Sequence, residues 1–298
     1  MNKLEGMPPI QSPQDVTLAV QAVMQQTSDP RLREIMTSLV KHLHGFVTEA
    51  RLTEAEFRQA AALINEIGQR SNDSHNEAVL MAGTLGVSQL VCLLNNGGVV
   101  DDDGSIQTSQ NLLGPFWRMH SPRTENGGSI LRSSTLGEAL RVEGLVVDSS
   151  GNPIPDAEVD IWHASPVGLY EQQDDSQADM NLRGKFTTNA EGKFWFTSVK
   201  PTGYPIPTDG VVGRLLTAQN RHPYRPAHLH ALIFKEGFKT LISQVYADDD
   251  EHLETDVQFG VTRATTGHFQ KQVDGSYVLQ YTYVMQAGEA VLPKPPIK

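Results

Sequence analysis

The chain has 298 residues and a net charge of −11, from 24 Lys and Arg against 35 Asp and Glu. At roughly 100–200 residues per domain, this length predicts one large or two modest domains, each able to bury a core. The acidic charge argues against nucleic acid and anionic membrane as partners. The single cysteine, Cys92, excludes a disulfide framework and a cysteine-based zinc site, and it fits a reducing compartment.

No apolar stretch reaches the roughly 18 residues that a membrane-spanning helix needs. The amino-terminal segment MNKLEGMPPIQSPQD also lacks the hydrophobic core of a signal peptide. We therefore expect a cytoplasmic protein with no membrane insertion.

Residues 1–105 are predicted to form a helical domain. Ser12-Pro13 and Asp29-Pro30 each pair a capping side chain with a proline at the first helical position. Thr53–Glu56 is a capping box that opens a third helix, and a fourth is predicted from about Glu77 to Leu94. The second helix has apolar residues at the i, i+3, i+4, i+7 spacing of an amphipathic helix, namely Leu32, Ile35, Met36, Leu39, Val40, Leu43, Phe46 and Val47.

The acidic run Asp101–Gly104 is most simply a solvated linker to the second domain, because the glutamate that a calcium loop needs is missing. From residue 106 to 298 the pattern changes to short segments rich in β-branched and aromatic residues, separated by Gly, Pro and Asn turns. The predicted strands are Leu140–Asp148, Ala157–His163, Gly192–Thr197, Ala227–Phe234 and Leu241–Tyr246. Their spacing is typical of an antiparallel β-sandwich, so the expected fold class is α+β.

His228 and His230 are the first candidates for metal binding. Side chains alternate along a strand, so these two imidazoles lie on one face, roughly 6–7 Å apart, and can reach a single ion. An isolated His-x-His pair is also compatible with two hydrogen-bonded histidines on a half-buried strand. Tyr170 and Tyr204 lie in loops near strand ends and are candidate ligands, although either could be a tyrosine at the rim with its hydroxyl in water.

Several longer motifs then occur in order over about 150 residues. They are Leu113–Trp117, Val159–Tyr170, Gln177–Lys185, Pro201–Pro207, Tyr224–His230 and Asp256–Thr262. With these motifs the sequence resembles the intradiol ring-cleaving dioxygenases, and most closely the branch that cleaves hydroxyquinol. The helical first third also suits that family.

The resemblance implies one ferric ion per subunit, held by Tyr170, Tyr204, His228 and His230. Phenolate is a hard anionic donor that favours Fe(III), whereas Fe(II) oxygenases use two histidines and a carboxylate. By the same resemblance, Tyr204 leaves the metal and accepts a substrate proton. Arg225 stabilises negative charge that develops on the ring. Gln244 is implied beside the metal.

The resemblance also places six residues around the substrate ring. They are Leu80, Gly83, Gly114, Pro115, Phe116 and Phe259. Related hydroxyquinol enzymes often have an acidic residue near the position of Gly83, where it can accept a hydrogen bond from the third hydroxyl. Glycine cannot do this, so the sequence departs from the pattern at a point that bears on substrate preference.

The expected reaction is cleavage of hydroxyquinol by O2 between its adjacent hydroxylated carbons, giving maleylacetate. Catechol or a substituted catechol is the alternative substrate, and a non-catalytic sandwich that only binds a ligand is a remote alternative. The resemblance further implies a homodimer joined through the helical domain, with a phospholipid in an apolar channel there.

Overall fold

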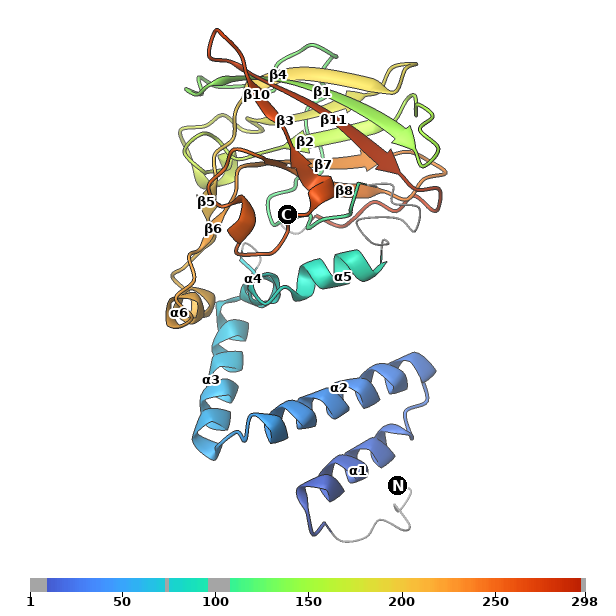
Figure 1. Cartoon of the computed structure of the whole chain (residues 1–298), viewed down its shortest axis with the longest axis vertical. Helices are drawn as coiled ribbons and strands as arrows, with labels where there is room; N and C mark the ends of the chain where they lie inside the picture. The colour runs from blue at the N-terminus through green and yellow to red at the C-terminus, as the bar shows by residue number, and fades with distance from the viewer. Residues whose placement is uncertain (1–9, 73–74, 96–107, 296–298) are drawn as a thin grey trace. The chain divides into compact units, whose positions relative to one another are not determined.

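The computed structural model describes residues 10–72, 75–95 and 108–295. The chain divides into two compact units, residues 1–65 and 66–298, and the division falls inside helix α3 (Figure 1). The predicted domain boundary at residue 105 and the predicted acidic linker lie outside the described residues.

The first unit contains the predicted amphipathic helices. Its helices are α1 (Pro13–Met24), α2 (Pro30–Glu49) and most of α3 (Glu54–Arg70). The predicted caps are present: the Asp15 N–H donates to Ser12 Oγ at 3.3 Å, and the Leu32 N–H donates to Asp29 Oδ1 at 3.0 Å. In the described parts of these three helices, Val40 is the one buried side chain.

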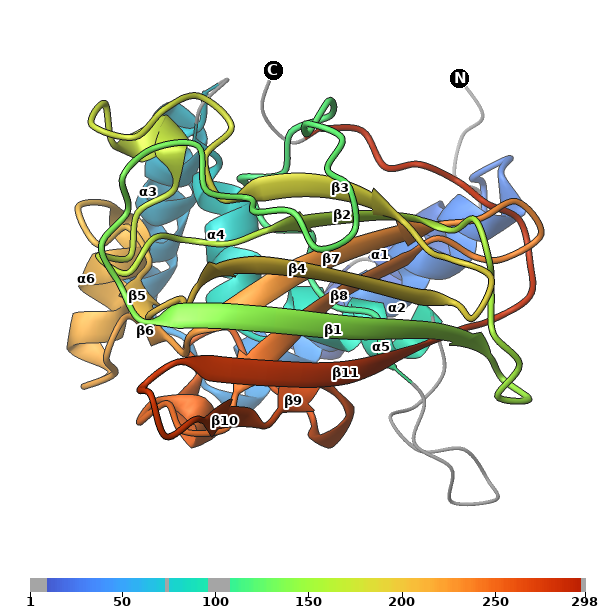
Figure 2. The same cartoon turned by 90° about the horizontal axis from the view of Figure 1, so that it is seen from above.

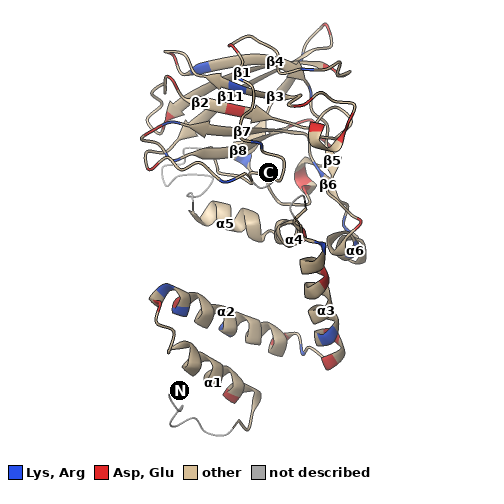
Figure 3. Cartoon of the chain, turned by 180° about the vertical axis from the view of Figure 1, so that it is seen from behind, with Lys and Arg blue, Asp and Glu red and all other residues tan. Residues whose placement is uncertain are grey.

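The predicted fourth helix is two helices, α4 (Glu77–Thr84) and α5 (Val87–Asn95), which meet at an angle of 76°. Gly86 lies between them with φ +73°, a left-handed conformation that glycine adopts without steric cost. The prediction of one continuous helix was wrong because a single glycine in an apolar run is not a sufficient break signal. Helix α5 has no charged residue, as Figure 3 shows.

No described helix is by itself long and apolar enough to cross a membrane; α4 and α5 pass that test of length and composition only as a bent pair.

The second unit is built on a sandwich of two sheets (Figure 2). The first sheet has the order β10-β11-β1-β4, and the second has the order β3-β2-β7-β8-β9. The strands of the first are β1 (Ala139–Asp148), β4 (Lys193–Val199), β10 (Phe269–Lys271) and β11 (Tyr277–Met285). Those of the second are β2 (Glu158–Trp162), β3 (Arg183–Thr187), β7 (His228–Phe234), β8 (Leu241–Ala247) and β9 (Thr266–Gly267).

The five predicted strands are therefore present, but the sheets are mixed and not strictly antiparallel. Strand β11 pairs parallel with β1, and β9 pairs parallel with β8. Parallel neighbours need a long connection, and nearly 130 residues separate β1 from β11, so local turn signals could not reveal this pairing.

The core lies between the sheets and is rich in aromatic rings. Phe186, Phe194 and Phe196 are all buried, with ring centroids 5.0–6.4 Å apart. Gly144 on β1 faces this cluster, and any side chain there would overlap the Phe194 ring. This close-packed core holds the strands in fixed positions. Side chains on the other face of the second sheet project away from it.

Two elements near the second sheet were not predicted. Helix α6 (Val211–Ala218) packs its apolar side chains, including Val212 and Leu216, against Ile206 and Val257. A two-stranded ribbon forms from β5 (Tyr204–Pro205) and β6 (Tyr224–Arg225), with Tyr204 directly opposite Arg225. Three short 3₁₀ turns complete the unit, at Glu171–Gln173, Leu253–Thr255 and Arg263–Thr265.

Candidate metal centre

Strand β7 projects both predicted histidines from one face of the second sheet. His228 and His230 are buried, and their Nε2 atoms lie 3.2 Å apart. The strand register places Trp162 of β2 and Gln244 of β8 beside His230, and Tyr246 of β8 beside His228. The sheet therefore assembles one cluster from three neighbouring strands.

His228 is held in a defined orientation. Its Nδ1 lies 2.6 Å from the carbonyl oxygen of Pro226, so Nδ1–H donates there and Nε2 is left with a free lone pair. Burial, with Arg225 nearby, lowers the pKa of His228 to about 3. The ring is therefore neutral at neutral pH, which is the state that binds a cation.

His230 is fixed by an aromatic ring stacked on it and by the close approach of a glycine. Trp162 stacks on it with ring centroids 4.8 Å apart and planes 8° from parallel. On another side a Cβ at Gly114 would lie 3.1 Å from Cε1 of the ring, so only glycine fits without displacement. Burial also lowers the pKa of His230 well below its usual value.

Tyr170 is almost completely buried, with 1% of its surface exposed. Phe116 stacks on its ring at a centroid distance of 4.4 Å. The next residue, Glu171, accepts a 2.6 Å hydrogen bond from Nε of buried Arg183, and this pair anchors the turn that carries Tyr170. Burial raises the pKa of the Tyr170 hydroxyl well above its usual value.

Tyr204 reaches the same point from the β5–β6 ribbon. Its hydroxyl oxygen lies 3.3 Å from that of Tyr170 and 3.4 Å from Nε2 of His228. The residue as a whole is half-buried, in contrast to the other three. Burial raises the pKa of its hydroxyl too, against the opposing effect of Arg225.

The four donor atoms fit a hard cation. They are two phenol oxygens and two imidazole nitrogens, with successive neighbours 3.2–3.4 Å apart. Atoms that ligate one ion through bonds of about 2 Å are spaced in this way. Among the described residues no group of three or more His, Cys, Asp or Glu could hold a metal, so any metal site here requires the phenols. A high-charge ion would supply what the buried phenols lack, namely stabilisation of their ionised form.

Arg225 lies beside this cluster and is 3% exposed. Its NH1 is 3.4 Å from Nε2 of His228, and its NH2 donates to Oε1 of Gln244 at 2.8 Å and to the Tyr246 hydroxyl. Asp256 accepts from its Nε at 3.2 Å. Burial opposes the charge of Arg225, but Asp256, Tyr246 and Tyr204 together outweigh it, so the pKa of Arg225 is raised well above its usual value.

The residues predicted to surround the substrate lie at different depths. Gly114 and Phe116 contact the candidate ligands His230 and Tyr170, as described above, whereas Pro115 is exposed. Gly83 is buried on α4.

Two further members of that set lie around α4. Leu80, on the same helix, packs against the cluster of Ile206 and Val257. Phe259 is 52% exposed, with the Arg221 guanidinium 5.1 Å from its ring centroid.

Three contributors were not identified from the sequence, and they are Asp256, Trp162 and Glu171. Asp256 and Trp162 act on site residues that are remote in the sequence, whereas Glu171 adjoins Tyr170 but acts through its ion pair with Arg183. Asp256, for example, is 31 residues from Arg225. Of the three, only Trp162 had a signal in the sequence, because it is an aromatic residue at the end of a predicted strand. Its pairing with His230 follows only from the strand register.

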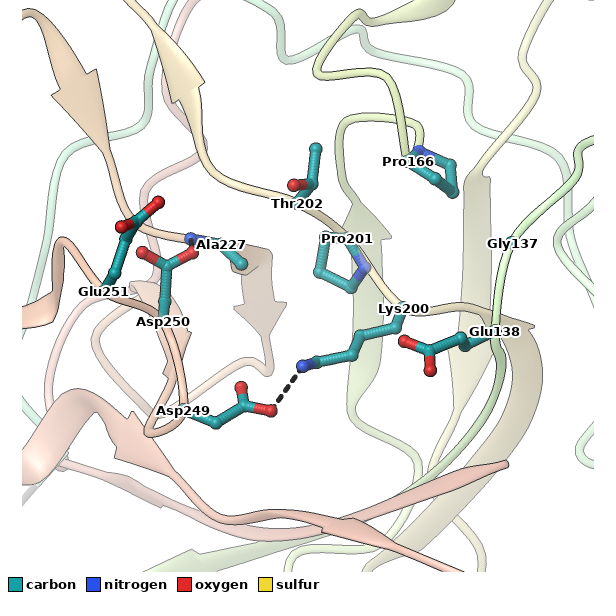
Figure 4. A pocket seen from close by; sticks show the side chains of 10 residues that line it. All are labelled: Gly137, Glu138, Pro166, Lys200, Pro201, Thr202, Ala227, Asp249, Asp250 and Glu251. Carbon is teal, nitrogen blue, oxygen red and sulfur yellow. Dashed lines mark hydrogen bonds and ion pairs between the residues drawn. The ribbon is translucent and has the colours of Figure 1, made fainter. Parts of the chain in front are cut away.

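A surface cavity of about 470 Å³ is lined in part by Ala227, the residue before β7 (Figure 4). In it, Lys200 Nζ is 2.5 Å from Asp249 Oδ2, and Asp250 accepts the Ala227 N–H at 2.9 Å. The cavity contains none of the predicted site residues, but Asp250 helps to fix the start of the strand that carries the histidines.

Comparisons with known proteins agree with this architecture. Residues 112–287 match the family described as Dioxygenase, and residues 29–99 match the catechol dioxygenase N terminus. The chain is 40% identical over 254 residues to a hydroxyquinol 1,2-dioxygenase of Rhizobium sp. (strain MTP-10005), covering 85% of this chain and 84% of the relative. It is 36% identical over 260 residues to a catechol 1,2-dioxygenase of Candida albicans, covering 87% and 84% respectively.

A solved structure of hydroxyquinol 1,2-dioxygenase from Pseudomonas putida DLL-E4 superposes with a TM-score of 0.85 at 32% identity. The match covers 93% of this chain and 99% of that one, so both the helices and the sandwich are included. On sequence, fold and family match together, the chain belongs to the intradiol ring-cleavage dioxygenase family.

Proposed function

We propose that the chain cleaves hydroxyquinol with O2 between its adjacent hydroxylated carbons, at an Fe(III) centre held by Tyr170, Tyr204, His228 and His230. The product is 3-hydroxy-cis,cis-muconate, which ketonises to maleylacetate. One observation carries the proposal: two phenol oxygens and two imidazole nitrogens converge within 3.2–3.4 Å of their neighbours beside a buried arginine. The Rhizobium and Pseudomonas relatives support the choice of substrate.

Fe(III) in this site would keep the phenols ionised and draw electron density from an ionised aromatic diol, so that the ring reacts with O2. The four proposed ligands differ in burial, and we assign their roles in the reaction accordingly. Tyr204 is the half-buried ligand, and we assign its phenolate oxygen the role of accepting a proton from a substrate hydroxyl. Tyr170 and the two histidines are held rigidly by their packing.

Arg225 provides fixed positive charge next to the cluster. Asp256 and Gln244 hold its guanidinium, so the charge costs no reorganisation when negative charge develops on the ring. Gln244 also donates to the carbonyl of Leu112 at 2.6 Å, which ties the segment before Gly114 to β8. We assign Gln244 the role of positioning Arg225 and the segment that contacts His230.

Catechol is the second candidate substrate. It is favoured by Gly83, which offers no side chain to a third hydroxyl, and by the similarity to the Candida albicans catechol enzyme. A non-catalytic sandwich remains the remote alternative, and the complete donor set argues against it.

The metal is tested first by loading the purified protein with iron. We expect a red-brown visible absorption band from phenolate-to-iron charge transfer, which is lost on chelation together with oxygen uptake. A colourless protein with iron bound would contradict the tyrosine ligands.

The substrate is tested by oxygen uptake of the iron-loaded protein, comparing kcat/KM for hydroxyquinol and catechol. A preference for hydroxyquinol of tenfold or more, about 1.4 kcal/mol in transition-state stabilisation, supports the assignment. A preference for catechol leaves the iron centre standing but rejects hydroxyquinol as the substrate.

The helical unit is proposed to join two copies of the chain into a homodimer, with a phospholipid in the apolar region there. The support is the apolar stripe of α2, which is largely exposed in the single chain. Light scattering gives the oligomeric state, and mass spectrometry of an organic extract identifies any lipid.

A further inference from the structure

Gly83 does not leave an empty space on α4. A Cβ built on this buried glycine would lie 3.2 Å from Nε2 and 3.3 Å from Cδ of Gln258. The side chain of Gln258 therefore lies directly over the glycine. A larger residue at position 83 would displace the end of that side chain.

Gln258 also lies close to the proposed catalytic arginine. Its backbone N–H donates to Oδ1 of Asp256 at 3.2 Å, and the same oxygen accepts from Nε of Arg225 at 3.2 Å. Gln258 therefore follows Asp256 by two residues, in the same loop that positions Arg225.

Helix α4 lies between this loop and the loop of Tyr204. Leu80 packs against Ile206 and Val257, which are neighbours of Tyr204 and Gln258 in the sequence. Gly83 follows Leu80 by three residues and shares its face of the helix. The contact of Gly83 with Gln258 is therefore on the side of the helix that faces both catalytic loops.

The Gln258 amide is available for a ligand. The residue is half-buried, and within the described ranges its side-chain amide makes no hydrogen bond to the protein. An amide offers both a donor and an acceptor, and a phenolic hydroxyl does the same, so the two can pair in either orientation of the amide. A hydrogen bond from this amide to the hydroxyl favours a substrate that carries the hydroxyl over an analogue that lacks it.

We infer that Gln258, seated over Gly83, is the residue that recognises the third hydroxyl of the aromatic substrate. This inference rests on the proposed function, because only a triol has that hydroxyl. It makes the pair of positions 83 and 258 one specificity element, in which the missing side chain of one makes room for the amide of the other.

The test uses iron-loaded, full-length protein and three variants. Gln258→Leu replaces the amide with an apolar side chain of similar size. Gly83→Ala keeps the Gln258 residue but adds a methyl group 3.2 Å from its Nε2, which displaces the amide. Gln270→Leu is the matched control, since Gln270 is an exposed residue of β10 outside the site.

For each protein, kcat/KM is measured with hydroxyquinol and catechol, and the dissociation constants of both are measured anaerobically from the visible band. We expect Gln258→Leu to lower kcat/KM for hydroxyquinol at least tenfold and to weaken its binding, with catechol changed less than twofold. Gly83→Ala should change the ratio in the same direction by a smaller factor, and Gln270→Leu should not change it.

Equal losses for both substrates in Gln258→Leu would overturn the inference, because they would indicate a general structural role. An unchanged ratio in both site variants would overturn it as well, while a parent protein that prefers hydroxyquinol would still uphold the proposed function. A parent protein that consumes catechol and not hydroxyquinol would instead reject the proposed substrate itself.

Discussion

In helix α2 of the first unit, the apolar side chains are 41–55% exposed at Leu32, Ile35, Leu39, Leu43, Phe46 and Val47. In the sandwich, by contrast, an apolar cluster of more than twenty buried side chains fills the space between the sheets. The local pattern is equally clear in both units, yet among the residues that the structure describes only the sandwich completes a core within one chain. The difference teaches that amphipathic periodicity specifies a helix and its apolar face but not what that face packs against.

The largest effect is expected from removing a core ring of the sandwich. Phe194→Ala should lower the free energy of unfolding by about 3–5 kcal/mol, because a fully buried ring leaves a cavity between close-packed strands. Denaturant titration followed by tryptophan fluorescence measures it, since Trp117, Trp162 and Trp195 all lie in the second unit.

The matched change in the helical unit is Val40→Ala. Two lost methyl groups at about 0.8 kcal/mol each predict a loss of about 1.6 kcal/mol, visible in helix ellipticity and not in tryptophan fluorescence. A fluorescence midpoint that shifts as much as in Phe194→Ala would show that the two units unfold together.

Tyr204→Phe sharpens the comparison, because it removes the hydroxyl of a proposed ligand but keeps the ring that packs in the site. Loss of the proposed proton acceptor should lower kcat roughly 100- to 1000-fold, about 3–4 kcal/mol in activation free energy. The fluorescence midpoint should stay unchanged because the ring is retained. Full activity in this variant would overturn the assignment of Tyr204.

One ion pair in each unit allows the contribution of a buried pair and of an exposed pair to stability to be compared. Asp256→Asn leaves buried Arg225 without its counter-charge and should cost about 3 kcal/mol of stability, with an accompanying loss of kcat. Glu34→Gln, which removes the exposed partner of Arg31 on α2, should cost less than about 0.5 kcal/mol. Similar unfolding midpoints for the two variants would contradict the burial of the Arg225 pair.

The smallest effect on catalysis is expected from the exposed stripe. Leu39→Asp with Leu43→Asp should convert the proposed dimer to a monomer in light scattering, while kcat/KM changes less than about twofold. The reason is that every proposed ligand and catalytic residue lies within residues 66–298. The double substitution Arg31→Glu with Glu34→Arg, on the same helix but outside the stripe, is the control and should leave the mass unchanged. A variant that stays dimeric would exclude this stripe as the interface.

Much of this protein could be read from its sequence because the relevant physics is local. Ser12 and Asp29 cap helices through atoms two or three residues away, and alternation along a strand places His228 and His230 on one face. Strand positions followed from β-branched segments between turns. The ligand and pocket assignments came from motif resemblance and stay proposals, although the structure brings the four donor atoms together.

Only the tertiary structure decided which distant groups meet. The parallel pairing of β11 with β1, the break of the fourth helix at Gly86, and the contacts of Asp256 with Arg225 and of Gln258 with Gly83 have no signature within a short window. These contacts depend on strand register and on the packing of loops that are far apart in the chain. Sequence periodicity sets which face a side chain occupies, whereas the close packing of the whole fold determines its neighbour.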